Sequence, residues 1–145
     1  MQQDEYPKVY LYRRMVQAKL FIDSHFAEPI DLNSISEEAY FSKFHFMRLF
    51  KKVYGKTPHR YLTTVRIEKA KLFLREEVRV VEVCSAVGFD SISSFTTLFK
   101  RQTGMTPSVF QIHQHARQQA IGTEPLRFIP NCFAENNGWV NSANK

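Results

Sequence analysis

The chain of 145 residues is 43% hydrophobic and 23% charged, enough for one sizeable core or two small ones, which excludes an intrinsically disordered protein. No apolar run approaches the roughly 18 residues of a membrane span, and residues 1–7 lack the pattern of a secretion signal, so we expect a cytoplasmic protein. The two cysteines, Cys84 and Cys132, have neither metal-binding nor redox spacing, so no metal or cofactor is expected. The net charge of +6 favours a polyanionic partner.

The first two predicted helices cover residues 14–26 and about 31–39. In the first, apolar side chains recur at broadly helical spacing, and they are Met15, Ala18, Leu20, Phe21, Ile22 and Phe26. The start of the second helix has two alternatives, because Asp31 can act as its N-cap and Ser34 with Glu37 matches a capping box. Its inward positions are Leu32, Ile35 and Ala39.

A third helix is predicted between Ser42, a favourable N-cap, and Gly55, which suits a helix C-terminus. The positions i, i+3, i+4 and i+7 of its apolar face are Phe46, Leu49, Phe50 and Val53. Pro58 then begins a long helix to about Arg75, which we expect to connect the two halves of the chain. The candidate inward positions of this connector are Tyr61, Leu62, Val65, Ala70, Phe73 and Leu74.

The helices predicted after the connector follow the same order as those before it. A short helix from about residue 80 to 87 is followed by a turn at Gly88 and a second helix over residues 91–103. A last helix covers about residues 107–118. The helical periodicity disappears in residues 119–145, which we expect to form an irregular tail.

The two halves are copies of one unit. The matching residues recur roughly 49 positions later in the same spacing: Phe46, Leu49, Phe50, Lys51, Gly55, Thr57 and Pro58 correspond to Phe95, Leu98, Phe99, Lys100, Gly104, Thr106 and Pro107. Each copy consists of a short helix, a turn and a second helix closed by glycine, which is the order of a helix-turn-helix. Stacked repeat proteins need about three or more repeats, so two copies indicate two recognition units within one domain.

The charges are distributed unevenly along the two copies. Residues 39–67 and 91–123 contain no acid, whereas the acids collect in residues 23–38 and 68–90. Each acid-free window contains the second helix of a copy. The positive field therefore coincides with the helix that would meet DNA in a helix-turn-helix.

The outward face of the helix after Ser42 combines aromatic and basic side chains. Arg48 can make a bidentate contact to a guanine edge, and Phe44 and Met47 suit a thymine methyl group. The phosphate contacts expected from this copy are Ser42, Lys43, His45, Lys51 and Lys52. The alternative interpretation is a solvated basic face with one stray aromatic side chain.

The corresponding face of the second copy carries shorter side chains. Its outward positions are Ser93, Thr97 and Lys100, and Ile92, Ser94, Thr96 and Arg101 lie nearby. Its candidate phosphate contacts are Ser91, Thr96, Lys100 and Arg101. Short hydroxyl side chains give single hydrogen bonds or methyl contacts, so we expect less sharp sequence readout here. The alternative is that these residues are only the polar start of a helix.

The second copy also carries a recognisable signature. Its residues are Val83, Cys84, Val87, Gly88, Phe89, Ser91, Phe95, Phe99, Lys100, Gly104, Thr106, Pro107 and Phe110. This pattern closely resembles the AraC/XylS-type bacterial transcription regulators, and residues 42–52 are similar to the first reading helix of that family's small stress activators. The resemblance covers about residues 14–117. The sequence departs from the family pattern in two respects. Thr97 stands where the family often has arginine. The usual alanine of the first helix is replaced by Ser36 in the first copy and by Cys84 in the second.

The resemblance implies an all-α fold of about seven helices, in which a long connector joins two helix-turn-helix units. Each reading helix is expected to enter a major groove of double-stranded DNA, about one turn or ~34 Å from the other. Carried over by position, the resemblance implies base contacts at Phe44, Met47 and Arg48 in the first reading helix and at Ile92, Ser93, Ser94 and Thr97 in the second. Family practice also implies contact with RNA polymerase and, usually, activation of transcription.

The expected division of the chain has three parts. They are an N-terminal extension (1–13), a DNA-binding domain (14–118) and a C-terminal tail (119–145). The DNA-binding domain consists of a first unit (14–57), a connector helix (58–75) and a second unit (80–118). No small-molecule effector is expected within this chain, which is either a stand-alone regulator or the DNA-binding end of a longer protein.

Two other classes of function are weighed against a regulator. One is a helical protein-interaction module that binds polymerase or another factor through its basic face and aromatic tail. The other is an enzyme, which we do not expect because the chain has no paired carboxylates, no glycine-rich phosphate loop and no usable Cys/His spacing. Related helical domains occur in DNA-repair methyltransferases, but the reactive Pro-Cys-His motif is absent from this sequence.

Overall fold

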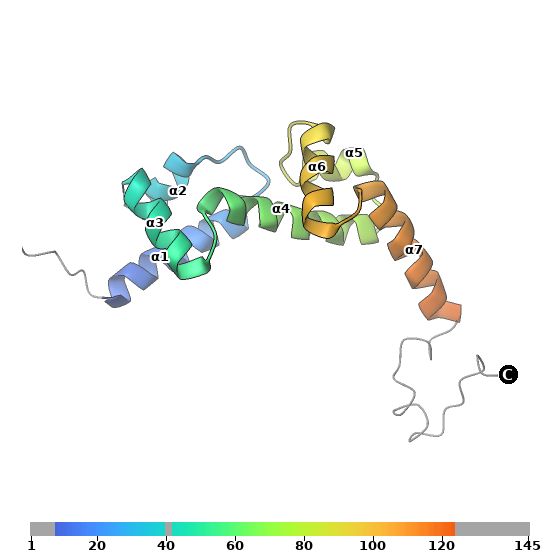
Figure 1. Ribbon diagram of the computed structural model, residues 1–145, viewed down its shortest axis with the longest axis horizontal. Helices are drawn as coiled ribbons and strands as arrows, with labels where there is room; N and C mark the ends of the chain where they lie inside the picture. The colour runs from blue at the N-terminus through green and yellow to red at the C-terminus, as the bar shows by residue number, and fades with distance from the viewer. Residues whose placement is uncertain (1–7, 40–41, 124–145) are drawn as a thin grey trace, which may run out of the picture.

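The computed structural model describes residues 8–39 and 42–123, and within these residues the chain is helical and contains no strand (Figure 1). The helices are α1 (Lys8–His25), α2 (Leu32–Ala39), α3 (Lys43–Tyr54), α4 (Pro58–Arg75), α5 (Val80–Ala86), α6 (Ile92–Thr103) and α7 (Pro107–Thr123). The prediction of an all-α fold of about seven helices is confirmed for the described residues. None of these helices is long and apolar enough to cross a bilayer.

Two hydrophobic cores form at the two ends of α4, which runs through the middle of the molecule (Figure 1). The first core contains Met15, Ala18, Ile22, Ile35, Phe46, Phe50 and Leu62. The second contains Ile67, Ala70, Leu74, Val83, Cys84, Val87, Phe95, Phe99 and Phe110. Helices α1 to α3 therefore pack on the first part of α4, and α5 to α7 pack on its second part.

The second helix of each unit begins and ends with the same local signals. Ser42 and Ser91 precede α3 and α6 in extended backbone conformation. Gly55 and Gly104 follow these helices with φ of 74° and 84°, a left-handed conformation that glycine adopts at little steric cost. The predicted boundaries of these two helices agree with the structure to within one residue at each end.

The first and last helices extend beyond their predicted bounds. Helix α1 begins at Lys8, within the segment predicted as an N-terminal extension, and α7 continues to Thr123, within the predicted tail. The first turns of α1 carry exposed apolar side chains such as Val9 and Tyr12, so no buried periodicity marks them. The rest of the predicted tail, residues 124–145 with Cys132, lies outside the described residues.

Several predicted core positions are corrected by the structure. Val53 and Leu20, both predicted on apolar stripes, are exposed by 41% and 56%. Ile67 is fully buried although it was absent from the predicted inward face of the connector. At the start of α2, Asp31 accepts a hydrogen bond from the Ser34 amide at 2.8 Å, which selects Asp31 as the cap. This bond lowers the pKa of the Asp31 carboxyl.

Candidate nucleic-acid interface

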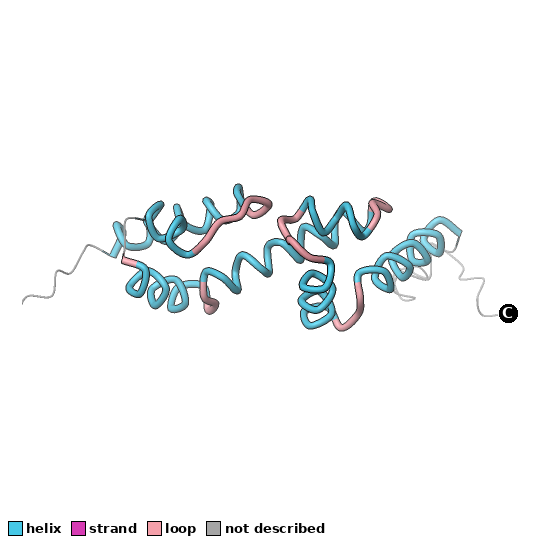
Figure 2. The backbone as a smooth tube through the Cα atoms, turned by 90° about the horizontal axis from the view of Figure 1, so that it is seen from above, coloured by secondary structure: helices cyan, strands magenta, loops and turns pink. Residues whose placement is uncertain are grey.

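Helices α3 and α6 lie on the same side of the connector α4 (Figure 2). Each is anchored by two fully buried phenylalanines, Phe46 and Phe50 in α3 and Phe95 and Phe99 in α6. These rings are four residues apart and occupy one face of each helix. The opposite faces of α3 and α6 therefore project from one side of the molecule.

The outward face of α3 is basic and carries one large aromatic side chain. Phe44 is 69% exposed, and Arg48 is exposed one turn further along the helix. The candidate phosphate contacts Ser42, Lys43, His45, Lys51 and Lys52 are also exposed. Met47, at the edge of this face, is half-buried. A phenylalanine ring left this open beside cations is typical of a surface that a partner covers.

The outward face of α6 carries short side chains, and some of their hydroxyl groups have local partners. Ile92 is 46% exposed, and Ser93, Ser94, Thr97, Lys100 and Arg101 are exposed, while Thr96 is half-buried. The Thr97 hydroxyl donates to the carbonyl of Ser93 at 2.9 Å. The Ser91 hydroxyl donates to Ser94 Oγ at 3.1 Å and accepts from the Ser94 amide at the same distance. Thr97 therefore keeps a methyl group and an acceptor oxygen for another molecule.

The acids near the connector are engaged away from these two faces. Ion pairs join Lys19 to Asp23 at 2.8 Å within α1 and Lys71 to Glu68 at 2.7 Å within α4. A third ion pair joins Arg79 to Glu82 at 2.6 Å, and the His115 ring contacts the Glu77 carboxylate at 2.6 Å. None of these residues belongs to α3 or α6. The cations on the two outward faces thus create a positive field that their own helices do not neutralise.

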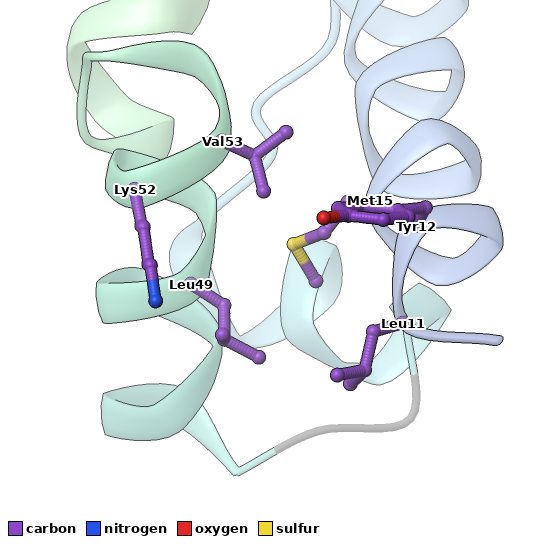
Figure 3. Close-up of a pocket in the computed structure, with 6 residues that line it drawn as sticks. All are labelled: Leu11, Tyr12, Met15, Leu49, Lys52 and Val53. Atoms are coloured by element: carbon purple, nitrogen blue, oxygen red, sulfur yellow. The ribbon is translucent and has the colours of Figure 1, made fainter. Parts of the chain in front are cut away.

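A cavity of about 420 Å³ lies between α1 and α3 (Figure 3). Its lining residues are Leu11, Tyr12, Met15, Leu49, Lys52 and Val53. The exposure of Val53 follows from this cavity, because α1 does not close over the end of α3. Sequence periodicity could not have found it, since the same apolar spacing is expected for a filled core.

Cys84 packs in the second core and is only 3% exposed. Burial raises the pKa of its thiol, and the nearby Asp90 acts in the same direction. A thiol in this environment remains protonated near neutral pH, whereas reactive cysteines have lowered pKa values. The prediction that Cys84 is a core residue is therefore confirmed.

Comparisons with known proteins agree with this geometry. A family model described as a helix-turn-helix domain matches residues 35–112. The uncharacterized HTH-type transcriptional regulator YobQ of Bacillus subtilis is 32% identical over 108 residues, which are 74% of this chain and 45% of YobQ. The bifunctional transcriptional activator/DNA repair enzyme AdaA of the same organism is 35% identical over 92 residues, 63% of this chain and 44% of its own. The chain thus spans less than half the length of either relative.

A solved structure gives the corresponding result for the fold. The DNA-binding domain of the global transcriptional factor AdpA, in complex with a target DNA, superposes with a TM-score of 0.70 at 27% identity. The superposition covers 72% of this chain and 96% of that domain. The described helices therefore have the arrangement of a DNA-binding domain that has been seen on DNA.

Proposed function

This chain belongs to the AraC-type helix-turn-helix family, and from that membership we propose that it is a transcription regulator that recognises specific double-stranded DNA. The observation that carries the proposal is the pair of outward faces on α3 and α6, on one side of α4 and without acids (Figure 2). In the proposed complex each helix enters a major groove, and the two grooves are about one helical turn, ~34 Å, apart.

The two helices have different tasks in this proposal. In α3, Arg48 reads a guanine edge through its two-pronged guanidinium, while Phe44 and Met47 contact thymine methyl groups. In α6, Ile92 and Thr97 make apolar or single hydrogen-bond contacts. The remaining proposed base contacts of α6 are Ser93 and Ser94. Short side chains discriminate less between bases, so α3 supplies most of the sequence preference.

The phosphate contacts fix the protein on the duplex without reading its sequence. In the first unit they are Ser42, Lys43, His45, Lys51 and Lys52. In the second unit they are Ser91, Thr96, Lys100 and Arg101. Because each neutralised phosphate releases a counterion, the affinity should fall steeply as the salt concentration rises.

Activation through RNA polymerase and the lack of catalysis are further parts of the proposal. AdaA combines activation with DNA repair in one protein, but it matches this chain over only 44% of its own length. Here the Cys84 thiol is buried and protonated, which argues against its use as an acceptor of alkyl groups. The apolar cavity between α1 and α3 keeps open the alternative of a protein-interaction module.

Selection of bound duplexes from a random DNA pool, followed by titration of the winner against scrambled DNA at two salt concentrations, tests the proposal. We expect two motifs about one helical turn apart, the sharper one under α3. Affinity that is equal for the winner and the scrambled duplex would contradict sequence-specific recognition. Binding to a protein partner that is insensitive to salt, without DNA enrichment, would support the interaction module instead.

A further inference from the structure

The two helix-turn-helix units touch at a second place besides α4. The turn between α1 and α2, residues 26–31, lies beside the turn between α5 and α6, residues 87–91 (Figure 1 and Figure 2). Gly88 has φ of +92°, and a Cβ atom there would lie 2.9 Å from the carbonyl oxygens of Phe26 and Ala27. The backbones of the two turns are therefore in direct contact, which only glycine permits at this position.

The Phe26 side chain joins the two hydrophobic cores at this place. It is partly buried and packs against the first core and against the second. The ammonium group of Lys69, on the second half of α4, lies 5.7 Å from the centre of the Phe26 ring. A residue of the first unit is thus in contact with the second unit through both its backbone and its side chain.

Arg66 projects from α4 into the same contact. Its Nε donates to the carbonyl of Phe26 at 2.7 Å, and its Nη2 donates to the carbonyl of Glu28 at 2.9 Å. The guanidinium carbon lies 5.7 Å from the centre of the Phe89 ring, within cation–π range. One side chain of the connector therefore holds the turn of the first unit by charge-assisted bonds and meets an aromatic ring of the second.

The connector passes from the first core to the second close to Arg66. Leu62 is buried in the first core and Ile67 in the second, so the residues between them bridge the two cores. Among these, the hydroxyls of Thr63 and Thr64 donate to carbonyls one turn earlier, at 3.1 and 2.9 Å. Such bonds often bend helices, and β-branched residues lower helix propensity.

We propose that this junction, formed by Phe26, Ala27, Glu28, Arg66, Gly88 and Phe89, fixes the angle between the two units and so sets the separation of DNA half-sites that the protein accepts. Arg66 is a positioning residue, because it acts through α3 and α6. The inference rests on the proposed function, since the separation matters only when both helices enter one duplex. One base pair moves a half-site by about 3.4 Å along the duplex and about 34° around it, so a rigid pair tolerates little change.

The first test varies the separation of the two selected motifs by single base pairs and measures the affinity of the full chain. Arg66→Met keeps the aliphatic stem but removes both donors. Arg75→Met is the matched control, because it removes one exposed arginine from the last turn of the same helix. A one-base-pair insertion should weaken binding about tenfold for the wild type and for Arg75→Met, but about threefold or less for Arg66→Met.

A duplex with only the α3 motif separates positioning from direct contact. Arg66→Met should bind it as tightly as the wild type does. Weaker binding to this duplex would mean that Arg66 supports the first unit or touches DNA, which would overturn its positioning role. Should Arg66→Met fail to fold, Arg66→Lys keeps the charge but loses the planar fork. The one-base-pair insertion should then weaken the binding of Arg66→Lys less than that of the wild type and of Arg75→Met. An equal loss of affinity in all three proteins would overturn the role of the junction.

The remaining outcomes distinguish the two proposals. Equal sensitivity to the insertion in the wild type and Arg66→Met overturns the role of the junction and leaves two-groove binding intact. If the affinity of the wild type does not change with the separation of the motifs, two-groove binding itself is overturned, and the proposed effect of the junction is overturned with it.

A second test needs no DNA. Spin labels at Gln17→Cys on α1 and Gln102→Cys on α6, both exposed positions, report the distance between the units in a Cys132→Ser background. The distance distribution should be narrow for the wild type and for Arg75→Met, and broader for Arg66→Met. Identical distributions in all three proteins would contradict the proposal even if DNA binding were lost for another reason.

Discussion

The second helices of the two helix-turn-helix units have the same length and the same buried face but different outward faces. Helices α3 and α6 are both 12 residues long, bury two phenylalanines at the same spacing and end at a left-handed glycine. At equivalent outward positions, however, Arg48 corresponds to Thr97 and Phe44 corresponds to Ser93. Packing therefore constrains one face of each helix, while the other face is available for the chemistry of binding.

The two units also differ in how the outward helix is held at its start. The Ser91 hydroxyl accepts a bond from the Ser94 amide, whereas Ser42 makes no such side-chain bond. The turn before α6 contains Gly88, pressed against the first unit. We therefore expect the residues at the start of α6 to contribute more to stability than those at the start of α3.

The largest effect is expected from Gly88→Ala. The new methyl group would meet two backbone carbonyls at 2.9 Å, and the left-handed φ adds strain for any residue with a Cβ. Together these should lower the free energy of unfolding by about 3 kcal/mol, measured by urea denaturation.

Gly55→Ala is the matched control in the first unit. Gly55 has φ of +74° but nothing within 4 Å of the position of a Cβ atom, so only the conformational strain of about 1 kcal/mol applies. Gly104→Ala, with open space at φ +84°, should behave like Gly55→Ala. Equal losses for Gly88→Ala and Gly55→Ala would show that the contact between the two turns contributes nothing to stability.

The features predicted from the sequence are those carried by local patterns. The phenylalanines of α3 and α6 recur at helical spacing, and Gly55 and Gly104 mark the helix ends, so the two units could be found without a structure. The outward faces follow from these patterns, because the residues opposite a buried stripe are exposed.

The features that were missed depend on contacts between distant segments. Ile67 is buried because the second core begins there, so the inward face of α4 changes along its length. Arg66 bonds to carbonyls that lie about 40 residues earlier, and backbone acceptors carry no sequence signature. The cavity beside Val53 likewise depends on where α1 packs.

A second prediction compares the base contacts of the two units. Arg48→Ala should weaken binding to the preferred site by about 1 to 3 kcal/mol and relax specificity at one position. Thr97→Ala should cost only about 0.5 kcal/mol, because the Thr97 hydroxyl proton is already bonded to Ser93. Competition titrations against single-base variants of the selected site measure both effects. Equal losses in the two variants would show that α6 reads sequence as strongly as α3.

A third prediction concerns the phosphate contacts, where the two units should behave alike. Lys51 and Lys100 are equivalent residues of the two copies, and both are exposed. Lys51→Ala and Lys100→Ala should each reduce the slope of log affinity against log salt concentration by about 1, on specific and scrambled DNA alike. A reduced slope for Lys51→Ala alone would indicate that only the first unit engages the duplex backbone.

Smaller effects on stability are expected at the helix starts. Ser91→Ala removes a hydroxyl that accepts from the Ser94 amide at 3.1 Å, and the loss of such a cap costs about 1 kcal/mol of stability. Ser42→Ala removes a hydroxyl that makes no side-chain cap bond, so its cost should be about a few tenths of a kcal/mol. Urea denaturation of both variants measures the difference, and Ser91→Gly, which leaves the backbone amides open to water, should recover part of the loss. If Ser42→Ala proves as costly as Ser91→Ala, the start of α3 is held as firmly as that of α6, and the helix starts then do not distinguish the two units.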